Sequence, residues 1–204
     1  MENYSYKTIK SRSQGLFRDR GSKFLAFAFH VTTEVKIKEI LDDLRSEYHD
    51  ARHHSYAWII GTDKYRFRAN DDGEPSGTAG RPVLGQIQKH DLTNILIVVI
   101  RYFGGTLLGT GGLINAYRSA AADALAQSEI ITKTIEELIE LKFPYAAMND
   151  VMKVLKEEHA EQLFQDFDID CSIKVSIPLE RSERLARRLK VIEKVSVNKL
   201  SINY

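Results

Sequence analysis

The stretch Asn94–Gly112 reads NILIVVIRYFGGTLLGTGG and carries the strongest structural signal in the chain. A continuous apolar run leads into Arg101, and five glycines lie within the nine residues that follow Phe103. The alanine-rich segment after them predicts a helix over about 112–128. A buried strand that leads through a glycine loop into a helix N-terminus can hold an anion, or can let two backbones approach closely. We therefore expect the functional centre here.

The hydrophobic pattern on either side of this stretch predicts an α+β protein of two domains, 1–130 and 131–204. In the first domain we expect strands over 22–31, 55–60, 65–69 and 94–102, helices over 34–48 and 82–90, and a loop over 71–80. In the second domain we expect strands over 134–143, 162–167, 171–177 and 194–202, with helices over 147–159 and 182–191. The βαββαβ order of the second domain is typical of a ferredoxin-like fold.

The composition indicates a globular protein and the cellular compartment in which it is expected. The 204 residues are 43% hydrophobic and 28% charged, and the formal net charge is +1. Attraction for nucleic acid must therefore come from a local patch of charge. The single cysteine, Cys171, is typical of the reducing cytoplasm, and the polar segment Met1–Lys10 does not resemble a secretory signal. The apolar run Ile95–Ile100 is too short to cross a membrane, so we expect a cytoplasmic protein.

The glycine loop has two interpretations. Its glycines can present backbone amides to a phosphate or carboxylate at the helix N-terminus, or they can merely permit tight packing of the strand on the helix. The pattern matches neither the mononucleotide P-loop nor the dinucleotide-binding fingerprint. We keep both interpretations, and the candidate anion-binding glycines are Gly104, Gly105, Gly109, Gly111 and Gly112.

The segment Arg68–Pro82 is dense in functional groups. Asp71, Asp72 and Glu74 offer carboxylates for a metal or for general-base chemistry. The same residues are typical of a polar turn held by its own side chains, and this is the interpretation that we favour. As a recognition loop the segment remains a candidate, because it is long and rich in polar groups. We expect neither a metal nor a cofactor.

Two adjacent histidines open a predicted strand. Neighbouring strand residues point to opposite faces, so His53 and His54 are not expected to bind one metal ion. One of them is expected to face the site and the other to lie at the surface.

Arg101 follows a buried strand, so its charge needs a partner. That partner is either a loop carboxylate, Asp72 or Glu74, or an anionic ligand. Five arginines can converge with the glycine loop as an anion pocket or an RNA-backbone patch: Arg52, Arg68, Arg81, Arg101 and Arg118.

Three motifs closely resemble the YigZ/IMPACT family: DAxH over 50–53, DDGEPSGTAGxP over 71–82, and RYFGGxxLG over 101–109, continued by GL at 112–113 and AY at 116–117. The resemblance implies an N-terminal α/β domain with a left-handed βαβ unit. Domains of this kind occur in a small-subunit ribosomal protein, in elongation factor G and in galactokinase-type kinases. It also implies a ferredoxin-like C-terminal domain similar to the last domain of elongation factor G. Ser55 stands where many relatives carry cysteine, and Asn115 where a basic residue is common.

The resemblance favours a non-enzymatic, translation-associated protein that binds RNA or the ribosome, without sequence-specific DNA binding. In the eukaryotic branch the family is linked to translational control. The alternative is a binder of, or an enzyme acting on, a phosphorylated or carboxylated small molecule, with His53 or Asp72 as the acid–base group. A protein-interaction module is a third possibility. The candidate ligand or RNA-binding residues are Arg52, His53, Arg68, Asp72, Glu74, Ser76, Thr78, Arg81, Arg101, Gly104, Gly105, Gly109, Gly111, Gly112 and Arg118.

Overall fold

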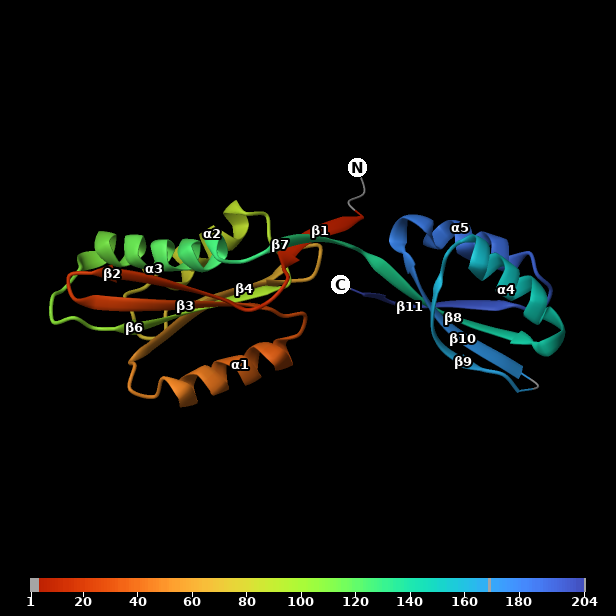
Figure 1. Cartoon of the computed structure of the whole chain (residues 1–204), viewed down its shortest axis with the longest axis horizontal. Coiled ribbons are helices and arrows are strands. Elements are labelled where there is room, and N and C mark those ends of the chain that lie inside the picture. The colour runs from red at the N-terminus through yellow and green to blue at the C-terminus, as the bar shows by residue number, and fades with distance from the viewer. Residues whose placement is uncertain (1–3, 169, 204) are drawn as a thin grey trace. The chain divides into compact units, whose positions relative to one another are not determined.

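The computed structural model describes residues 4–168 and 170–203 (Figure 1). The chain divides into two compact units. One is Tyr6–Lys133, and the other combines Met1–Ser5 with Thr134–Tyr204. The division along the chain therefore lies at Thr134, and Tyr4 and Ser5 belong to the C-terminal unit.

The N-terminal unit is built on a five-stranded sheet in which every neighbouring pair is antiparallel. Helix α1 covers one face, and α2 and α3 cover the other (Figure 1). The sheet runs in the order β2 (Ser13–Asp19), β3 (Ser22–His30), β6 (Ile95–Tyr102), β4 (His53–Ile60) and β5 (Arg66–Asn70). The helices are α1 (Glu34–Glu47), α2 (Gly80–Lys89) and α3 (Gly109–Ala126), and β1 (Ser5–Ile9) pairs with β7 (Ile130–Thr134) in a separate two-stranded sheet.

The central strand β6 explains the continuous apolar run. Its side chains alternate between two hydrophobic layers, because successive strand residues point to opposite faces. Ile95, Ile97 and Val99 pack under α2 and α3, whereas Leu96, Val98 and Ile100 pack under α1. Both faces are covered by helices, so the run lacks a polar alternation even though the sheet is antiparallel. By the same alternation, Arg101 belongs to the α3 face and Tyr102 to the α1 face.

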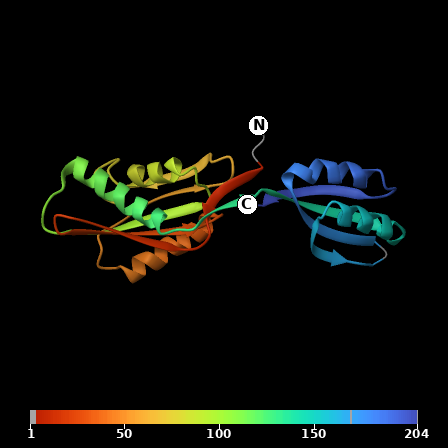
Figure 2. The ribbon, with the colours of Figure 1, turned by 45° about the horizontal axis from the view of Figure 1, so that its top comes forward.

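The C-terminal unit has the ferredoxin-like fold that its pattern predicts. Its antiparallel sheet has the order β11-β8-β10-β9, in which the first and third strands of the unit are central. Both helices lie on one face of this sheet (Figure 2). The elements are β8 (Glu136–Pro144), the 3-10 turn η1 (Tyr145–Ala147), α4 (Met148–Glu157), β9 (Glu161–Asp166), β10 (Asp170–Pro178), α5 (Leu179–Lys190) and β11 (Ser196–Asn203).

The predicted elements are all present with small shifts, but three strands are additional: β1, β2 and β7. Helix α3 also begins at Gly109 rather than near Gly112. Strand β2 lacks a recognisable pattern because its inward positions include Ser13 and Gly15. A Cβ atom on Gly15 would lie 2.2 Å from the backbone nitrogen of Ala124 in α3. The close approach of α3 therefore requires a small residue where an apolar one would mark a strand.

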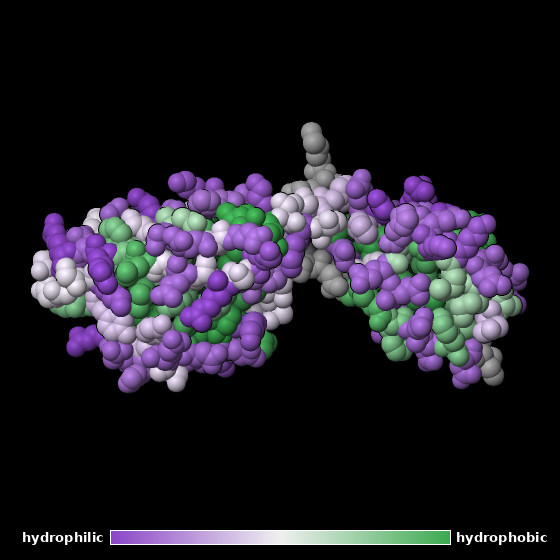
Figure 3. Space-filling model, viewed as in Figure 1, coloured by the Kyte–Doolittle hydropathy of each residue, from purple (hydrophilic) through white to green (hydrophobic). Residues whose placement is uncertain are grey.

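On the face drawn in Figure 3, apolar residues form scattered patches between hydrophilic ones. Among the described residues, none of the helices is long and apolar enough to cross a membrane.

Candidate functional site

Asp71 fixes the course of the acidic loop between β5 and α2. Its carboxylate accepts hydrogen bonds from the backbone amides of Gly77, Ala79 and Gly80 at 2.8, 3.0 and 2.8 Å. Ala79 and Gly80 form the beginning of α2, so the carboxylate satisfies amides that the helix itself leaves free. Burial raises the pKa of Asp71, but the amide hydrogen bonds outweigh it and hold that pKa below its ordinary value. Asp71 thus serves the polar turn.

Asp72 anchors the loop to strand β4. Its carboxylate accepts a hydrogen bond from the backbone amide of His54 at 2.6 Å and lies 3.6 Å from the guanidinium of Arg45. Its carbonyl oxygen lies 2.8 Å from Nδ1 of His53. A carbonyl can only accept, so Nδ1 of His53 carries the proton and Nε2 is left free. The contacts of Asp72 position β4 and His53, and they do not support Asp72 as an acid–base group.

Glu74, Arg101 and Tyr117 form a buried polar network under α3. Arg101 donates from Nη1 to both carboxylate oxygens of Glu74, at 2.7 and 2.9 Å, and the Tyr117 hydroxyl donates to Glu74 at 2.8 Å. Arg101 is only 7% exposed and Glu74 8%. Burial, together with the Glu74 carboxylate, raises the pKa of Tyr117, so its hydroxyl stays protonated. The sequence left Asp72, Glu74 or an anionic ligand as the partner of Arg101. The structure shows that Glu74 is the partner, so the Arg101 charge is neutralised within the chain.

The glycine loop packs against the β2–β3 turn. A Cβ atom on Gly104 would lie 1.9 Å from the carbonyl carbon of Gly21, and the amide of Gly104 donates to the hydroxyl of Ser22 at 3.1 Å. Gly105 and Gly109 adopt positive φ angles of 86° and 71°. The tight packing expected between strand and helix is therefore a packing between two loops.

A hollow of about 680 Å³ lies beside this loop, and we call it the loop hollow. Two of its apolar residues are prominent: Phe103 is 56% exposed and Leu107 is 81% exposed. Arg52 is exposed and has no ion-pair partner among the described residues. The Nε atom of Arg101 is buried without a hydrogen-bond partner in the described part of the chain. The full lining is Asp50, Arg52, His53, Arg101, Tyr102, Phe103 and Leu107.

Asp50 is the acidic residue of the lining, and its carboxylate accepts a hydrogen bond from a neighbouring tyrosine. The Tyr102 hydroxyl donates to its carboxylate at 2.7 Å. Burial and this carboxylate raise the pKa of Tyr102 to about 12. Asp50 therefore holds Tyr102 as a neutral donor and contributes one negative charge at the edge of the loop hollow.

Two further cations lie in or beside the β2–β3 turn, which packs against the glycine loop. Arg20 precedes Gly21, which packs against Gly104, and the Lys23 ammonium lies 6.0 Å from the ring centroid of Tyr102. Neither cation is predicted as a site residue from the sequence, because β2 shows no strand pattern and the turn is not recognisable without it. The sequence SQGLFRDRGSK over 13–23 contains one signal that could have indicated these cations. Gly21 lies between Arg20 and Lys23, and a glycine there is typical of the turn of a hairpin.

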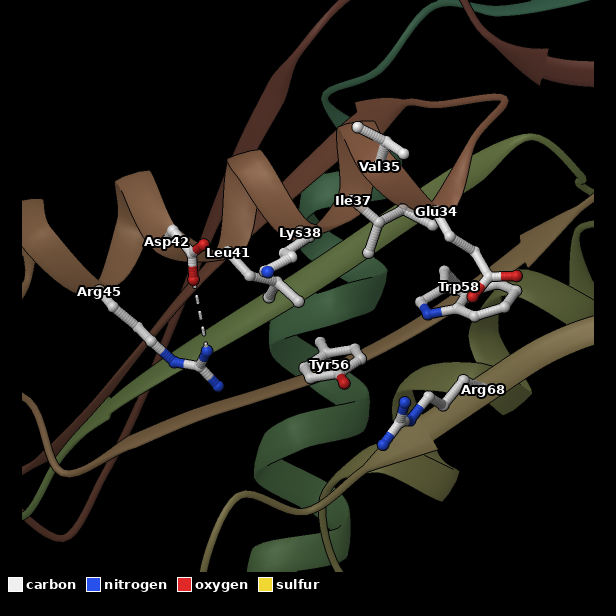
Figure 4. Close-up of a pocket in the computed structure, with 10 residues that line it drawn as sticks. All are labelled: Glu34, Val35, Ile37, Lys38, Leu41, Asp42, Arg45, Tyr56, Trp58 and Arg68. Carbon is white, nitrogen blue, oxygen red and sulfur yellow. Dashed lines mark ion pairs between the residues drawn. The ribbon is translucent and has the colours of Figure 1, made fainter.

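The remaining candidates do not form one cluster. Arg68 lines a separate groove between α1 and the sheet, which we call the α1 groove (Figure 4). Arg81 and Arg118 are exposed on α2 and α3, and Arg81 contributes to the low pKa of Asp71. Ser76 is exposed in the acidic loop, whereas Thr78 is buried and donates to the carbonyl of Pro75 at 2.6 Å. The expected convergence of five arginines is therefore wrong: Arg52 and Arg101 line the loop hollow, and Arg68 lies on the other face of the sheet.

The second histidine is not a surface residue. His54 is buried on the α1 face, and its Nε2 atom has no hydrogen-bond partner among the described residues. Burial lowers the pKa of His54, partly offset by the nearby Asp72 carboxylate. His53, on the other face, is the histidine that reaches the loop hollow. The part of the chain that the structure describes contains no cluster of three or more histidine, cysteine or acidic side chains suited to a metal ion.

These features define a two-domain α+β protein with a candidate anion site. The first unit is a helix-covered antiparallel sheet whose acidic loop is held by the buried Glu74–Arg101 pair, and the second unit is ferredoxin-like. The Impact N-terminal domain family matches residues 20–125, and the chain belongs to the IMPACT family. It is 32% identical to IMPACT family member YigZ of Escherichia coli (strain K12), over 89% of this chain and 90% of that protein. It is 41% identical to the Protein IMPACT homolog of Saccharomyces cerevisiae, over 45% of this chain and 36% of that protein.

The fold also matches a solved structure along its length. A crystal structure described as that of a hypothetical protein aligns with a TM-score of 0.75 at 29% identity, and 99% of each chain is covered.

Proposed function

We propose that this chain is a cytoplasmic, translation-associated protein whose N-terminal unit binds RNA at the loop hollow. One observation carries the proposal: Arg52 lines a hollow that exposes the ring of Phe103, and the β2–β3 hairpin that packs against the neighbouring glycine loop carries Arg20 and Lys23. Cations supply contacts to phosphate, and an exposed aromatic ring can stack on an unpaired base. Phe103 also lies 5.5 Å from the Arg101 guanidinium, which supports the ring from one side.

The polar atoms within the hollow fit the same ligand chemistry. Arg52 offers an unpaired guanidinium, and the ring of His53 also lines the hollow. With a formal net charge of +1, the chain has no strong global field, so these local groups must supply the attraction.

The translational part of the proposal rests on the family. The resemblance implies one domain of the kind found in a small-subunit ribosomal protein and in elongation factor G. It implies a second domain similar to the last domain of elongation factor G. A chain that combines two domains of these kinds is expected to meet RNA in the translation machinery.

Sedimentation with purified ribosomal particles tests this function. We expect co-migration at low salt that is lost at high salt, because phosphate contacts release counterions. The double variant Arg20→Glu/Arg52→Glu should remain in the soluble fractions. The control Lys89→Glu/Lys153→Glu changes the net charge equally at exposed helix positions that do not line the hollow, and it should co-migrate like the unchanged chain. Migration of both variants with the particles would contradict the proposal.

A small anionic molecule at the same hollow is the second candidate function. It is favoured by the size of the hollow, about 680 Å³, which suits a compact phosphate or carboxylate compound held by the Arg52 guanidinium in its lining. Thermal unfolding with phosphorylated and carboxylated metabolites tests it, since a ligand of the folded state raises stability by RT ln(1 + [L]/Kd). Concentration-dependent stabilisation that Arg52→Glu abolishes would support it, and an unchanged melting temperature across the set would exclude it.

A further inference from the structure

The α1 groove is an open depression between helix α1 and strands β4 and β5. It encloses about 450 Å³. Its floor is formed by Tyr56 and Trp58, and Figure 4 shows that side chains of α1 form the opposite wall. Among these, Ile37 and Leu41 are buried core residues, whereas Val35 is 70% exposed at the edge of the groove. The groove therefore has a base of largely buried apolar side chains, with Val35 as its exposed apolar edge.

The charges around the groove leave a positive surplus. Glu34 pairs with Arg66 at 2.7 Å, and Asp42 lies 3.9 Å from Arg45. After these pairings two lining charges remain, Lys38 on α1 and Arg68 on β5, and neither has an ion-pair partner among the described residues. Figure 4 shows these two side chains on opposite sides of Tyr56. An occupant of the groove would thus meet a cation on each wall.

We infer that the α1 groove docks an acidic protein segment that carries bulky apolar side chains. The apolar side chains would contact Val35 and the small exposed parts of Tyr56 and Trp58, and acidic side chains beside them would pair with Lys38 and Arg68. A nucleic acid fits less well, because Tyr56 and Trp58 are each only 7% exposed and offer no free ring face for a base. This surface lies on the opposite face of the sheet from Arg101, so it is separate from the RNA site proposed above.

Fluorescence anisotropy with labelled peptides tests the inference. The probe is a short peptide in which leucine alternates with glutamate. Its two controls replace glutamate by lysine, or leucine by serine. We expect saturable binding of the first peptide and much weaker binding of both controls. The variant Lys38→Glu/Arg68→Glu replaces two favourable charge pairs with the peptide by repulsion. It should therefore weaken binding by about tenfold or more.

Two further variants separate the groove from general charge effects. Lys89→Glu/Lys153→Glu has the same change of net charge outside the groove and should bind the peptide unchanged. Val35→Ser removes apolar contact at an exposed position, so it should weaken binding without unfolding the chain. The inference is overturned if the lysine peptide binds equally well, if Lys38→Glu/Arg68→Glu binds like the control variant, or if neither acidic peptide binds. Displacement of a bound peptide by unstructured RNA would identify the groove as a nucleic-acid site instead.

Discussion

The acidic loop illustrates, at the scale of single residues, what a sequence can and cannot specify. The position of Arg101 after a buried strand predicts that its charge needs a partner. The choice between Asp72 and Glu74 stays open, because two carboxylates on one loop are equivalent until the path of the loop is known. The structure resolves it through Asp71, whose amide contacts turn the loop so that Glu74 is buried and Asp72 meets β4.

Removal of the Glu74 charge is expected to destabilise the fold. In Glu74→Gln the buried Arg101 loses its counter-charge, and breaking a buried pair costs about 3 kcal/mol. Urea unfolding measures the change. The double variant Glu74→Gln/Arg101→Met removes the orphaned charge and should recover part of the loss. A cost below about 1 kcal/mol for Glu74→Gln would show that the pair does not hold the loop.

Asp71 should make the stability of the N-terminal unit depend on pH. Its folded-state pKa lies below the ordinary value, so its carboxylate stabilises the fold above the unfolded-state pKa. That contribution is lost as the pH falls through the folded-state pKa. Asp71→Asn should lower the free energy of unfolding by about 2 kcal/mol at neutral pH, since charge-assisted hydrogen bonds are weakened. The difference between the two chains should shrink in acid, and a difference that is independent of pH would contradict this role.

At the scale of elements, the loop hollow depends on the contact between the β2–β3 turn and the glycine loop. Strong periodicity makes β3, α1, β6 and the C-terminal βαββαβ order predictable. Strand β2 escapes prediction because Gly15 replaces an apolar residue under α3. The cations of the turn escape with it, since it is the packing of Gly21 on Gly104 that brings the segment with Arg20 and Lys23 against the glycine loop. A sequence pattern within one helix or strand does not predict which two loops come together, so it does not predict a site that is formed by both.

Gly104 and Gly111 provide a matched pair that tests this contact. A Cβ atom on Gly104 would overlap the Gly21 carbonyl carbon, whereas one on Gly111 meets nothing within 4 Å. Gly104→Ala should therefore separate the turn from the loop and lower stability by about 2 kcal/mol or more. Gly111→Ala lies inside α3 and should raise stability by about 0.5 kcal/mol. Chemical unfolding measures both, and equal effects would argue against the loop contact.

At the scale of the whole molecule, the fold class and the family are accessible from the sequence, whereas the site is accessible only in part. The second unit has the ferredoxin-like strand order that its pattern predicts. Of the fifteen candidate residues, Arg52, His53 and Arg101 line the loop hollow. The loop acids do not line it: Glu74 pairs with Arg101, and Asp72 accepts a hydrogen bond from the backbone of β4. Because the net charge is only +1, the proposed RNA binding would depend on few cations, and the effect of removing each of them should be measurable.

The salt dependence of binding to a short unstructured RNA tests the central claim most directly. A plot of log Kd against log salt for the unchanged chain should have a slope set by the number of phosphates contacted. Arg20→Glu/Arg52→Glu should weaken binding and reduce that slope by about one for each cation removed. Lys89→Glu/Lys153→Glu should leave the slope unchanged. An identical slope for both variants, or RNA binding that does not respond to salt, would contradict phosphate recognition at the loop hollow.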